Sequence, residues 1–300
     1  MPETTLFEGL SAFPLTPTDA DGRLMPDLMR VFLTRIRDAG ADSIGLLGST
    51  GGYAYLTRAE REHAVRVAVA CVGGTIPIVV GAGALRTDEA QALARDAKAA
   101  GADGLLLAPM SYAPLTDEEV FRHFEAVAQA ADLPLCVYNN PTTTKFTFSP
   151  ALLARLADLP NVVAAKMPFP VDGGVEAELA TLRAALPDGF AIGYSGDFGA
   201  ATALLAGADA WYSVVGGLLP GPALALTRAA RAGDRETTAR LAEAFAPLFG
   251  LFRAHGGFRV MYAMADLLGL ARLEPPRPVL PLSEGVRAEV EAALARIPSA

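Results

Sequence analysis

The sequence is poor in the residues that form disulfide frameworks and metal sites. It has two cysteines, Cys71 and Cys136, and three histidines among its 300 residues. Both cysteines lie within apolar runs, so we interpret them as reduced core residues. The histidines lie far apart, and no cluster of histidine, cysteine and carboxylate residues has the spacing of metal ligands. We therefore expect no disulfide, no metal and no other cofactor.

Positive charge is also scarce. The chain has 25 lysines and arginines against 33 acidic residues, a formal net charge of -8 at pH 7. Proteins that bind nucleic acid or anionic membranes present a basic face, so neither is an expected partner. No apolar run approaches the roughly 18 residues of a membrane span. The segment Met1–Glu8 lacks the basic and apolar regions of a signal peptide, and we expect a cytoplasmic protein.

Hydrophobic residues, in contrast, make up 52% of the chain and are arranged in a repeating order. Short, nearly continuous apolar segments alternate eight times with segments of helical periodicity, as expected for parallel strands buried on both faces. This alternation predicts a closed (β/α)8 TIM barrel, with a doubly wound open sheet as the alternative. The expected strands are 7–15, 43–47, 76–80, 104–107, 135–138, 162–166, 190–194 and 210–215.

The expected helices follow the strands in the order required for such a barrel. Thr57, Thr87 and Thr116 are predicted to cap three of them. Three additional helices, 234–254, 258–268 and 283–296, are predicted after the barrel. We divide the chain into a barrel, 1–232, and a C-terminal helical extension, 233–300, packed on it as one structural unit. The barrel helices are 24–39, 57–72, 87–100, 116–131, 149–157, 174–185, 198–206 and 220–232.

Lysine is rare, which draws attention to Lys166. The only others are Lys98, in an alanine-rich helical pattern, and Lys145, in a polar turn, whereas Lys166 follows a continuous apolar run. An arginine would serve a surface ion pair equally well, but only lysine can lose its proton on burial and attack a carbonyl. Lys166 is therefore a candidate nucleophile. The competing interpretation is a lysine that leaves the end of a strand for solvent.

Other polar residues fall at the C-terminal ends of the expected strands, where active sites of such barrels lie. The segment 48–52, Gly-Ser-Thr-Gly-Gly, exposes backbone N–H groups and two hydroxyls, which suits a carboxylate or a phosphate. Tyr112 and Tyr138 can relay protons. Together these parts would hold a 2-oxo acid, let Lys166 attack its keto carbon and move the protons. An ordinary glycine-rich loop and tyrosines that only pack remain open as alternatives.

The ordered set of motifs resembles the dihydrodipicolinate synthase / N-acetylneuraminate lyase family of class I aldolases, over nearly the whole length. It comprises the Gly-Ser-Thr-Gly loop, Gly81-Ala-Gly83, Pro109 to Tyr112, Phe121-Arg-His-Phe124, Tyr138-Asn139 with Pro141, Lys166, and Ser195-Gly-Asp197.

This resemblance implies roles for individual residues. Lys166 is the Schiff-base lysine, and Tyr138 is the general acid/base beside it. Ser49 joins the proton relay and Thr50 helps to bind the carboxylate of pyruvate. Tyr112 matches a relay tyrosine that family members insert into the site of a neighbouring subunit, which implies a homodimer or homotetramer. We assign four further residues to substrate binding: Gly51, Thr143, Gly196 and Gly216.

The sequence also departs from the family pattern. Gly52 replaces a usual glutamate, and Thr143 replaces the arginine that binds the carboxylate of aspartate semialdehyde in the true synthases, so a bidentate contact is lost. Ser111 replaces a tyrosine, and Met167-Pro-Phe-Pro170 differs from the usual acidic or small residues. The positions that bind feedback lysine in some synthases are Arg58, Arg61 and Leu85, so we expect no regulation by lysine.

We therefore predict a cofactor-independent lyase that forms a lysine imine. It would make or break a carbon–carbon or carbon–oxygen bond in pyruvate or a 2-oxo acid, such as a 2-oxo-3-deoxy sugar acid. The runner-up is dihydrodipicolinate synthase activity itself. Two hypotheses of other classes remain: a sugar-phosphate isomerase that grips phosphate at Gly196 and Gly216-Gly217, and a barrel that binds a 2-oxo acid without turnover.

Overall fold

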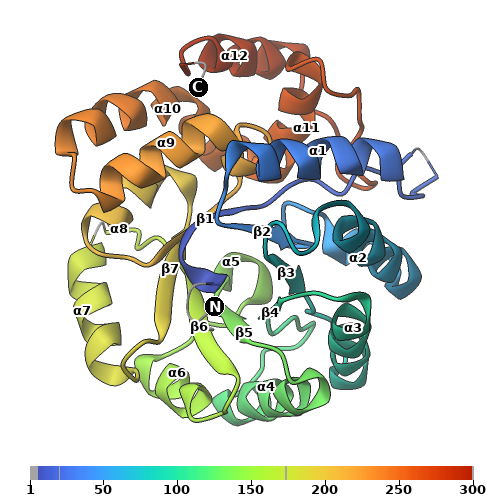
Figure 1. The fold of residues 1–300 in the computed structure, drawn as a ribbon, viewed down its shortest axis with the longest axis vertical. Helices are drawn as coiled ribbons and strands as arrows, with labels where there is room; N and C mark the ends of the chain where they lie inside the picture. The colour runs from blue at the N-terminus through green and yellow to red at the C-terminus, as the bar shows by residue number, and fades with distance from the viewer. Residues whose placement is uncertain (1–5, 20, 173, 299–300) are drawn as a thin grey trace.

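Within the described residues, eight parallel strands close into a barrel at the centre of the molecule (Figure 1). The computed structural model describes residues 6–19, 21–172 and 174–298. Most of the segment Met1–Glu8, in which we expect no signal peptide, lies outside the described residues. Each strand pairs with the next, and β8 pairs with β1. The predicted barrel is confirmed and the open sheet is wrong. The strands are β1 Gly9–Ala12, β2 Ser43–Leu46, β3 Ile78–Gly81, β4 Gly104–Leu107, β5 Leu135–Tyr138, β6 Val162–Pro168, β7 Ala191–Ser195 and β8 Ala210–Ser213.

Helices alternate with the strands and form the outer ring (Figure 1). Each buries an apolar face; in α1 the buried residues Met29, Phe32, Leu33 and Ile36 recur at helical spacing. The ring helices are α1 Pro26–Ala39, α2 Arg58–Val72, α3 Thr87–Ala100, α4 Asp117–Ala131, α6 Pro150–Ala157, α7 Val175–Ala185, α8 Ala200–Leu205 and α9 Pro220–Arg231.

Two of the three predicted helix caps are confirmed. Thr57 and Thr116 each form a capping box with the glutamate three residues on. The third prediction is wrong, because Thr87 is the first residue of α3 and Arg86 precedes it without a side-chain cap. The Thr87 hydroxyl instead lies 3.0 Å from Nδ1 of His123 in α4. The hydroxyl that the local pattern assigned to capping α3 therefore makes a contact between two helices.

A repeated Ala-Gly-Ala-Asp sequence fixes the bottom of the barrel. Its glycine ends α1 and α3 in a left-handed cap. Its aspartate then accepts a hydrogen bond from a neighbouring strand. Asp42 accepts from the N–H of Leu10, at 2.7 Å. Asp103 and Asp209 accept in the same way from the N–H groups of Ile78 and Ile192. These joints are structural, as the sequence indicated.

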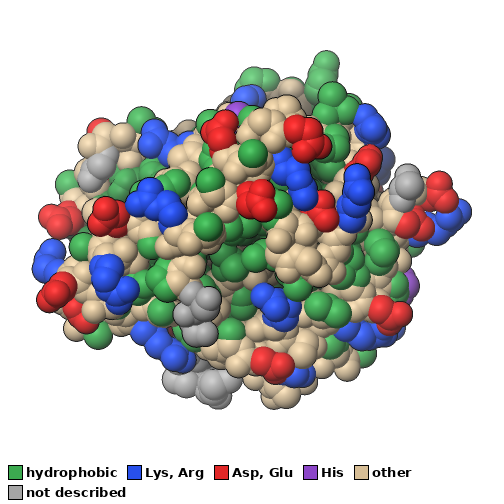
Figure 2. Space-filling view, turned by 90° about the horizontal axis from the view of Figure 1, so that it is seen from above, with side chains coloured by type: hydrophobic (Ala, Val, Ile, Leu, Met, Phe, Trp, Pro, Cys, Tyr) green, Lys and Arg blue, Asp and Glu red, His purple; other side chains and the backbone are tan. Residues whose placement is uncertain are grey.

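The C-terminal helices cover one side of the barrel (Figure 1). They are α10 Arg235–His255, α11 Gly257–Leu267 and α12 Glu284–Leu294. Helix α10 packs on α8 and α9, and α12 packs on α10 and α11. The division of the chain at residue 232 stays a prediction. Among the described helices, none combines the length and apolar character needed to cross a membrane. Acidic and basic side chains are interspersed over the face seen in Figure 2.

Short helical turns at the carboxyl ends of four strands are not predicted by the sequence patterns. They are η2 Tyr53–Tyr55, α5 Pro141–Thr144, η3 Asp197–Gly199 and η4 Val215–Gly217. These turns lie where a barrel of this kind builds its active site, and they place the polar residues described next.

Candidate active site

Lys166 lies inside the barrel. It is 5% exposed, on β6 directly opposite Tyr138 of β5. Its Nζ atom is 4.1 Å from the centroid of the Tyr138 ring and 3.9 Å from that of Phe13. The ring of Tyr212, from β8, lies at 5.6 Å. The interpretation of Lys166 as a lysine that leaves the strand for solvent is therefore wrong, and the amine is held among three aromatic rings.

Phe13, whose ring forms the floor beneath this amine, was not predicted as a site residue from the sequence. Its ring fills the space left by two missing side chains, because a Cβ atom on Gly45 or Gly48 would overlap it. A glycine inside the second strand, where a β-branched residue is usual, was the available signal. Phe13 therefore packs on Gly45 and Gly48 with its ring next to the amine of Lys166.

The hydroxyl of Tyr138 connects the lysine to the loop after β2. Its oxygen lies 3.2 Å from Oγ of Ser49, and it accepts a hydrogen bond from Nδ2 of Asn140 at 3.0 Å. Because Asn140 can only donate through this nitrogen, the tyrosine proton is available to Ser49 or to a substrate. The structure therefore brings Lys166, Tyr138 and Ser49 together, and it adds Asn140, which the sequence analysis did not select.

The loop after β2 presents backbone N–H groups to the same space. Leu47 adopts a left-handed conformation, with φ of 55°, and its carbonyl passes so close to Gly81 that a side chain there would overlap it. Such strain in a leucine is typical of functional sites. In the described part of the chain, the N–H groups of Ser49, Thr50 and Gly51 have no acceptor. Three consecutive free N–H groups in a loop are an arrangement that binds carboxylates and other anions in proteins.

The glycines after β7 and β8 have a different use. The N–H of Gly216 donates to Oγ of Ser213 at 2.9 Å, and that of Gly217 donates to the carbonyl of Val214 at 3.1 Å. Gly196 adopts φ of 90° with its bare Cα toward Phe169 and Phe198. The N–H groups of Gly216 and Gly217, which the sugar-phosphate isomerase hypothesis assigns to phosphate binding, are thus already hydrogen-bonded within the protein. This argues against that hypothesis.

Asp197 fixes the turn that carries these glycines. Its carboxylate is buried and accepts hydrogen bonds from Nε1 of Trp211 at 3.0 Å and from the N–H groups of Val214 and Val215 at 3.0 and 2.7 Å. Burial raises the pKa of Asp197 to about 6, and the three donors oppose that shift.

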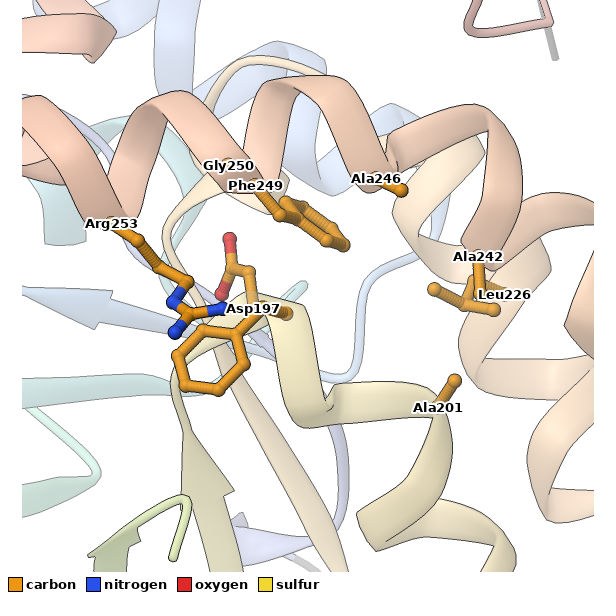
Figure 3. Close-up of a pocket in the computed structure, with 9 residues that line it drawn as sticks. Asp197, Ala201, Leu226, Ala242, Ala246, Phe249, Gly250 and Arg253 are labelled. Atoms are coloured by element: carbon orange, nitrogen blue, oxygen red, sulfur yellow. The ribbon is translucent and has the colours of Figure 1, made fainter. Parts of the chain in front are cut away.

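Asp197 also borders a cavity of 240 Å³ outside the barrel, between α8, α9 and α10 (Figure 3). Its described lining includes neither Lys166 nor Tyr138, so the cavity is separate from the lysine site.

Two of the predicted site residues lie away from Lys166. Tyr112 is 99% exposed at the rim, on the loop after β4, so within one chain it stands apart from the lysine. Thr143 is exposed in α5, and its hydroxyl donates to the carbonyl of Asn140 at 3.3 Å. Thr143 does line a pocket of 350 Å³, and Ser49 is another residue of that lining. The pocket is completed by Gly52, Tyr53, Ala54, Tyr55, Met110, Ser111, Thr144 and Phe258.

Comparisons with known proteins agree with this geometry. Residues 6–297 match the model of the dihydrodipicolinate synthetase family. A 4-hydroxy-tetrahydrodipicolinate synthase of Synechococcus elongatus is 35% identical over 99% of this chain and 98% of its own. One of Methylococcus capsulatus is 40% identical over 74% of this chain and 75% of its own. A crystal structure of a dihydrodipicolinate synthase from Agrobacterium tumefaciens superimposes with a TM-score of 0.97 and 56% identity, covering 99% of this chain and 100% of the other.

Proposed function

The chain belongs to the dihydrodipicolinate synthetase family, and on that basis we propose that it is a lyase that binds pyruvate, or another 2-oxo acid, as an imine of Lys166. One observation carries the proposal. A buried lysine amine faces a tyrosine whose hydroxyl is bonded to a loop serine. That loop also offers three free N–H groups. These are the parts that imine formation with a 2-oxo acid requires.

The reaction begins with the carboxylate of pyruvate in the loop of Ser49, Thr50 and Gly51. The neutral amine of Lys166 attacks the keto carbon and loses its two protons as the imine forms, and Tyr138 passes two protons to the keto oxygen, which leaves as water. Ser49 returns a proton to Tyr138 through the 3.2 Å contact between their oxygens. Loss of a proton from the methyl carbon of the imine then gives an enamine, whose carbon attacks an aldehyde. Hydrolysis releases the product and restores the lysine.

The relay requires a connection to solvent beyond Ser49. Tyr112 stands exposed at the rim, and the resemblance assigns it to the site of a second copy of the chain. We therefore propose that the active form is at least a homodimer, in which Tyr112 of each copy completes the relay of the other. Tyr112→Phe should slow turnover, and Tyr112→Glu should in addition weaken the association measured by analytical ultracentrifugation.

The condensation of pyruvate with aspartate semialdehyde is the second candidate, because it is the activity named for the relatives above. The lining of the pocket weakens it. Thr143 occupies the position of the carboxylate-binding arginine, and no lysine or arginine is among the described residues that line the pocket. A neutral hydroxyl replaces a bidentate charged contact, so affinity for this semialdehyde should be low.

Hydrogen exchange at the methyl group of pyruvate tests the proposed chemistry without knowledge of the second substrate. In deuterium oxide, reversible enamine formation should replace the methyl protons, which nuclear magnetic resonance detects. Lys166→Ala should abolish this exchange, whereas Lys145→Ala, a change at an exposed turn, should not affect it. Equal exchange in all three proteins would show that the lysine imine is not formed.

A further inference from the structure

The pocket beyond Ser49 is where a second substrate has to lie. Ser49 connects the two spaces, because its Oγ contacts the hydroxyl of Tyr138 and the same residue lines the pocket. A chain attached to the carbon that reacts with the enamine therefore extends outward from Tyr138 into this volume. The chemistry of the pocket lining then determines which side chain on that substrate is accepted.

Aromatic and apolar side chains dominate that lining. The ring of Phe258, from the start of α11, stacks on Tyr55 with a centroid separation of 5.9 Å and an interplanar angle of 10°. Phe258 reaches this position because Gly52 has no side chain, and a Cβ atom there would lie 3.3 Å from the ring. Tyr53 and Met110 complete the apolar surface. Gly52 stands where the family usually has a glutamate, and the ring of Phe258 lies next to it because it has no side chain.

The pocket has no fixed charge. Among its described lining residues there is no lysine, arginine, aspartate or glutamate, and the nearest cations in sequence bond elsewhere. Arg61 donates to the carbonyls of Gly81 and Gly83. Lys145 donates to the carbonyl of Thr142, and Arg259 to that of His255. A substrate that carries a second carboxylate would lose its hydration here without gaining a charged partner.

Half of the hydroxyl groups among the described lining residues are already paired within the protein. Thr143 and Thr144 both donate their protons to the carbonyl of Asn140, at 3.3 and 3.0 Å. Ser49 is engaged with Tyr138. A sugar chain would bring several hydroxyls, and each one left unpaired lowers affinity by roughly tenfold. The hydroxyls of Ser111, Tyr53 and Tyr55, which also line the pocket, remain for hydroxyl groups on the substrate, but none of them can balance a charge.

We infer that the second substrate is an aldehyde with an uncharged aromatic side chain. This inference rests on the proposed function. In the reaction, the methyl carbon of pyruvate loses one proton and forms a bond to the aldehyde carbon, whose oxygen takes up one proton. The product is a 4-hydroxy-2-oxo acid that bears the aromatic group at carbon 4. The water released on imine formation is consumed on hydrolysis, and the reverse reaction cleaves the same bond. A cavity of about 150 Å³ holds benzene, so a pocket of 350 Å³ accommodates a substituted ring.

The test compares three aldehydes with pyruvate: benzaldehyde, succinic semialdehyde and glyceraldehyde. The value of kcat/KM for benzaldehyde should exceed both others by at least tenfold. Phe258→Ala should reduce it by about tenfold. Thr143→Arg, at an exposed position, should favour succinic semialdehyde. Val31→Ala, on the exposed face of α1, is the control and should alter none of these values.

The outcomes separate this inference from the proposed function. Methyl exchange with a preference for benzaldehyde that Phe258→Ala removes supports both. Methyl exchange with a preference for either other aldehyde, or with turnover of none, overturns the aromatic substrate and leaves the lysine imine intact. A preference for benzaldehyde that survives Phe258→Ala also overturns it, because the ring would then have no part in selection. Absence of methyl exchange overturns the proposed function and this inference with it.

Discussion

Removal of the Tyr138 hydroxyl is the most informative single perturbation of the site. In Tyr138→Phe the ring still packs 4.1 Å from the lysine amine, but the contacts to Ser49 and Asn140 are lost. Two hydrogen bonds contribute about 1 kcal/mol each to stability, so the variant should fold. A positioned acid/base group contributes about 10²–10⁴-fold to rate, which corresponds to about 3–5 kcal/mol of the barrier.

The assay is the initial rate of hydrogen exchange at the methyl group of pyruvate, which depends on imine and enamine formation alone. We expect Tyr138→Phe to lower it by at least about 100-fold. Tyr212→Phe is the matched control, because this buried tyrosine also faces the barrel interior, and among the described residues its hydroxyl has one hydrogen-bond partner, Sγ of Cys136 at 3.4 Å. The control should stay within about threefold of the wild type. A folded Tyr138→Phe that exchanges as fast as the control would refute the acid/base role.

Two further predictions concern stability. Burial raises the pKa of Asp197 to about 6, against about 3.9 for an exposed aspartate. Because the folded state binds this proton more tightly, the contribution of Asp197 to the free energy of unfolding is fully present below about pH 4 and falls by roughly 3 kcal/mol as the pH rises to about 6. Denaturant titrations from pH 4 to 7.5 should show this fall in the wild type relative to Asp197→Asn, and parallel curves would contradict it. The turn after β8 gives the other prediction, since a Cβ atom on Gly217 would overlap the backbone of Phe13. Gly217→Ala should therefore lower the free energy of unfolding by about 1–3 kcal/mol. Gly250→Ala, in α10 with open space around it, should raise it by up to about 1 kcal/mol. Thermal unfolding measures both changes. A Gly217→Ala variant that melts at the same temperature as the wild type would show that the contact with Phe13 is easily relieved.

The barrel was predictable because its signals are local. Each strand is a continuous apolar run, and each helix has its own periodicity and, for α2 and α4, its own capping box. The prediction for Thr87 failed because a side chain of another helix, His123, competes for its hydroxyl. Propensity and pattern contain no information about such a partner.

The site was predictable only in part. Lys166 stood out because lysine is rare in this chain, and the loop at residues 48–52 stood out by composition. The floor formed by Phe13 depends on a space opened by Gly45 on a neighbouring strand, and Phe258 enters the pocket from a helix some 200 residues further along the chain. The turn after β8 is likewise set by the buried side chain of Asp197. These relations arise only when the chain has closed on itself.

The measurement that tests the central claim most directly is reduction with borohydride in the presence of pyruvate, followed by mass analysis of the intact protein and its peptides. We predict one pyruvate adduct on the peptide that contains Lys166. It should be retained in Lys145→Ala and absent in Lys166→Ala. A folded protein that traps neither pyruvate nor any other 2-oxo acid, or that traps pyruvate on a different lysine, would contradict it.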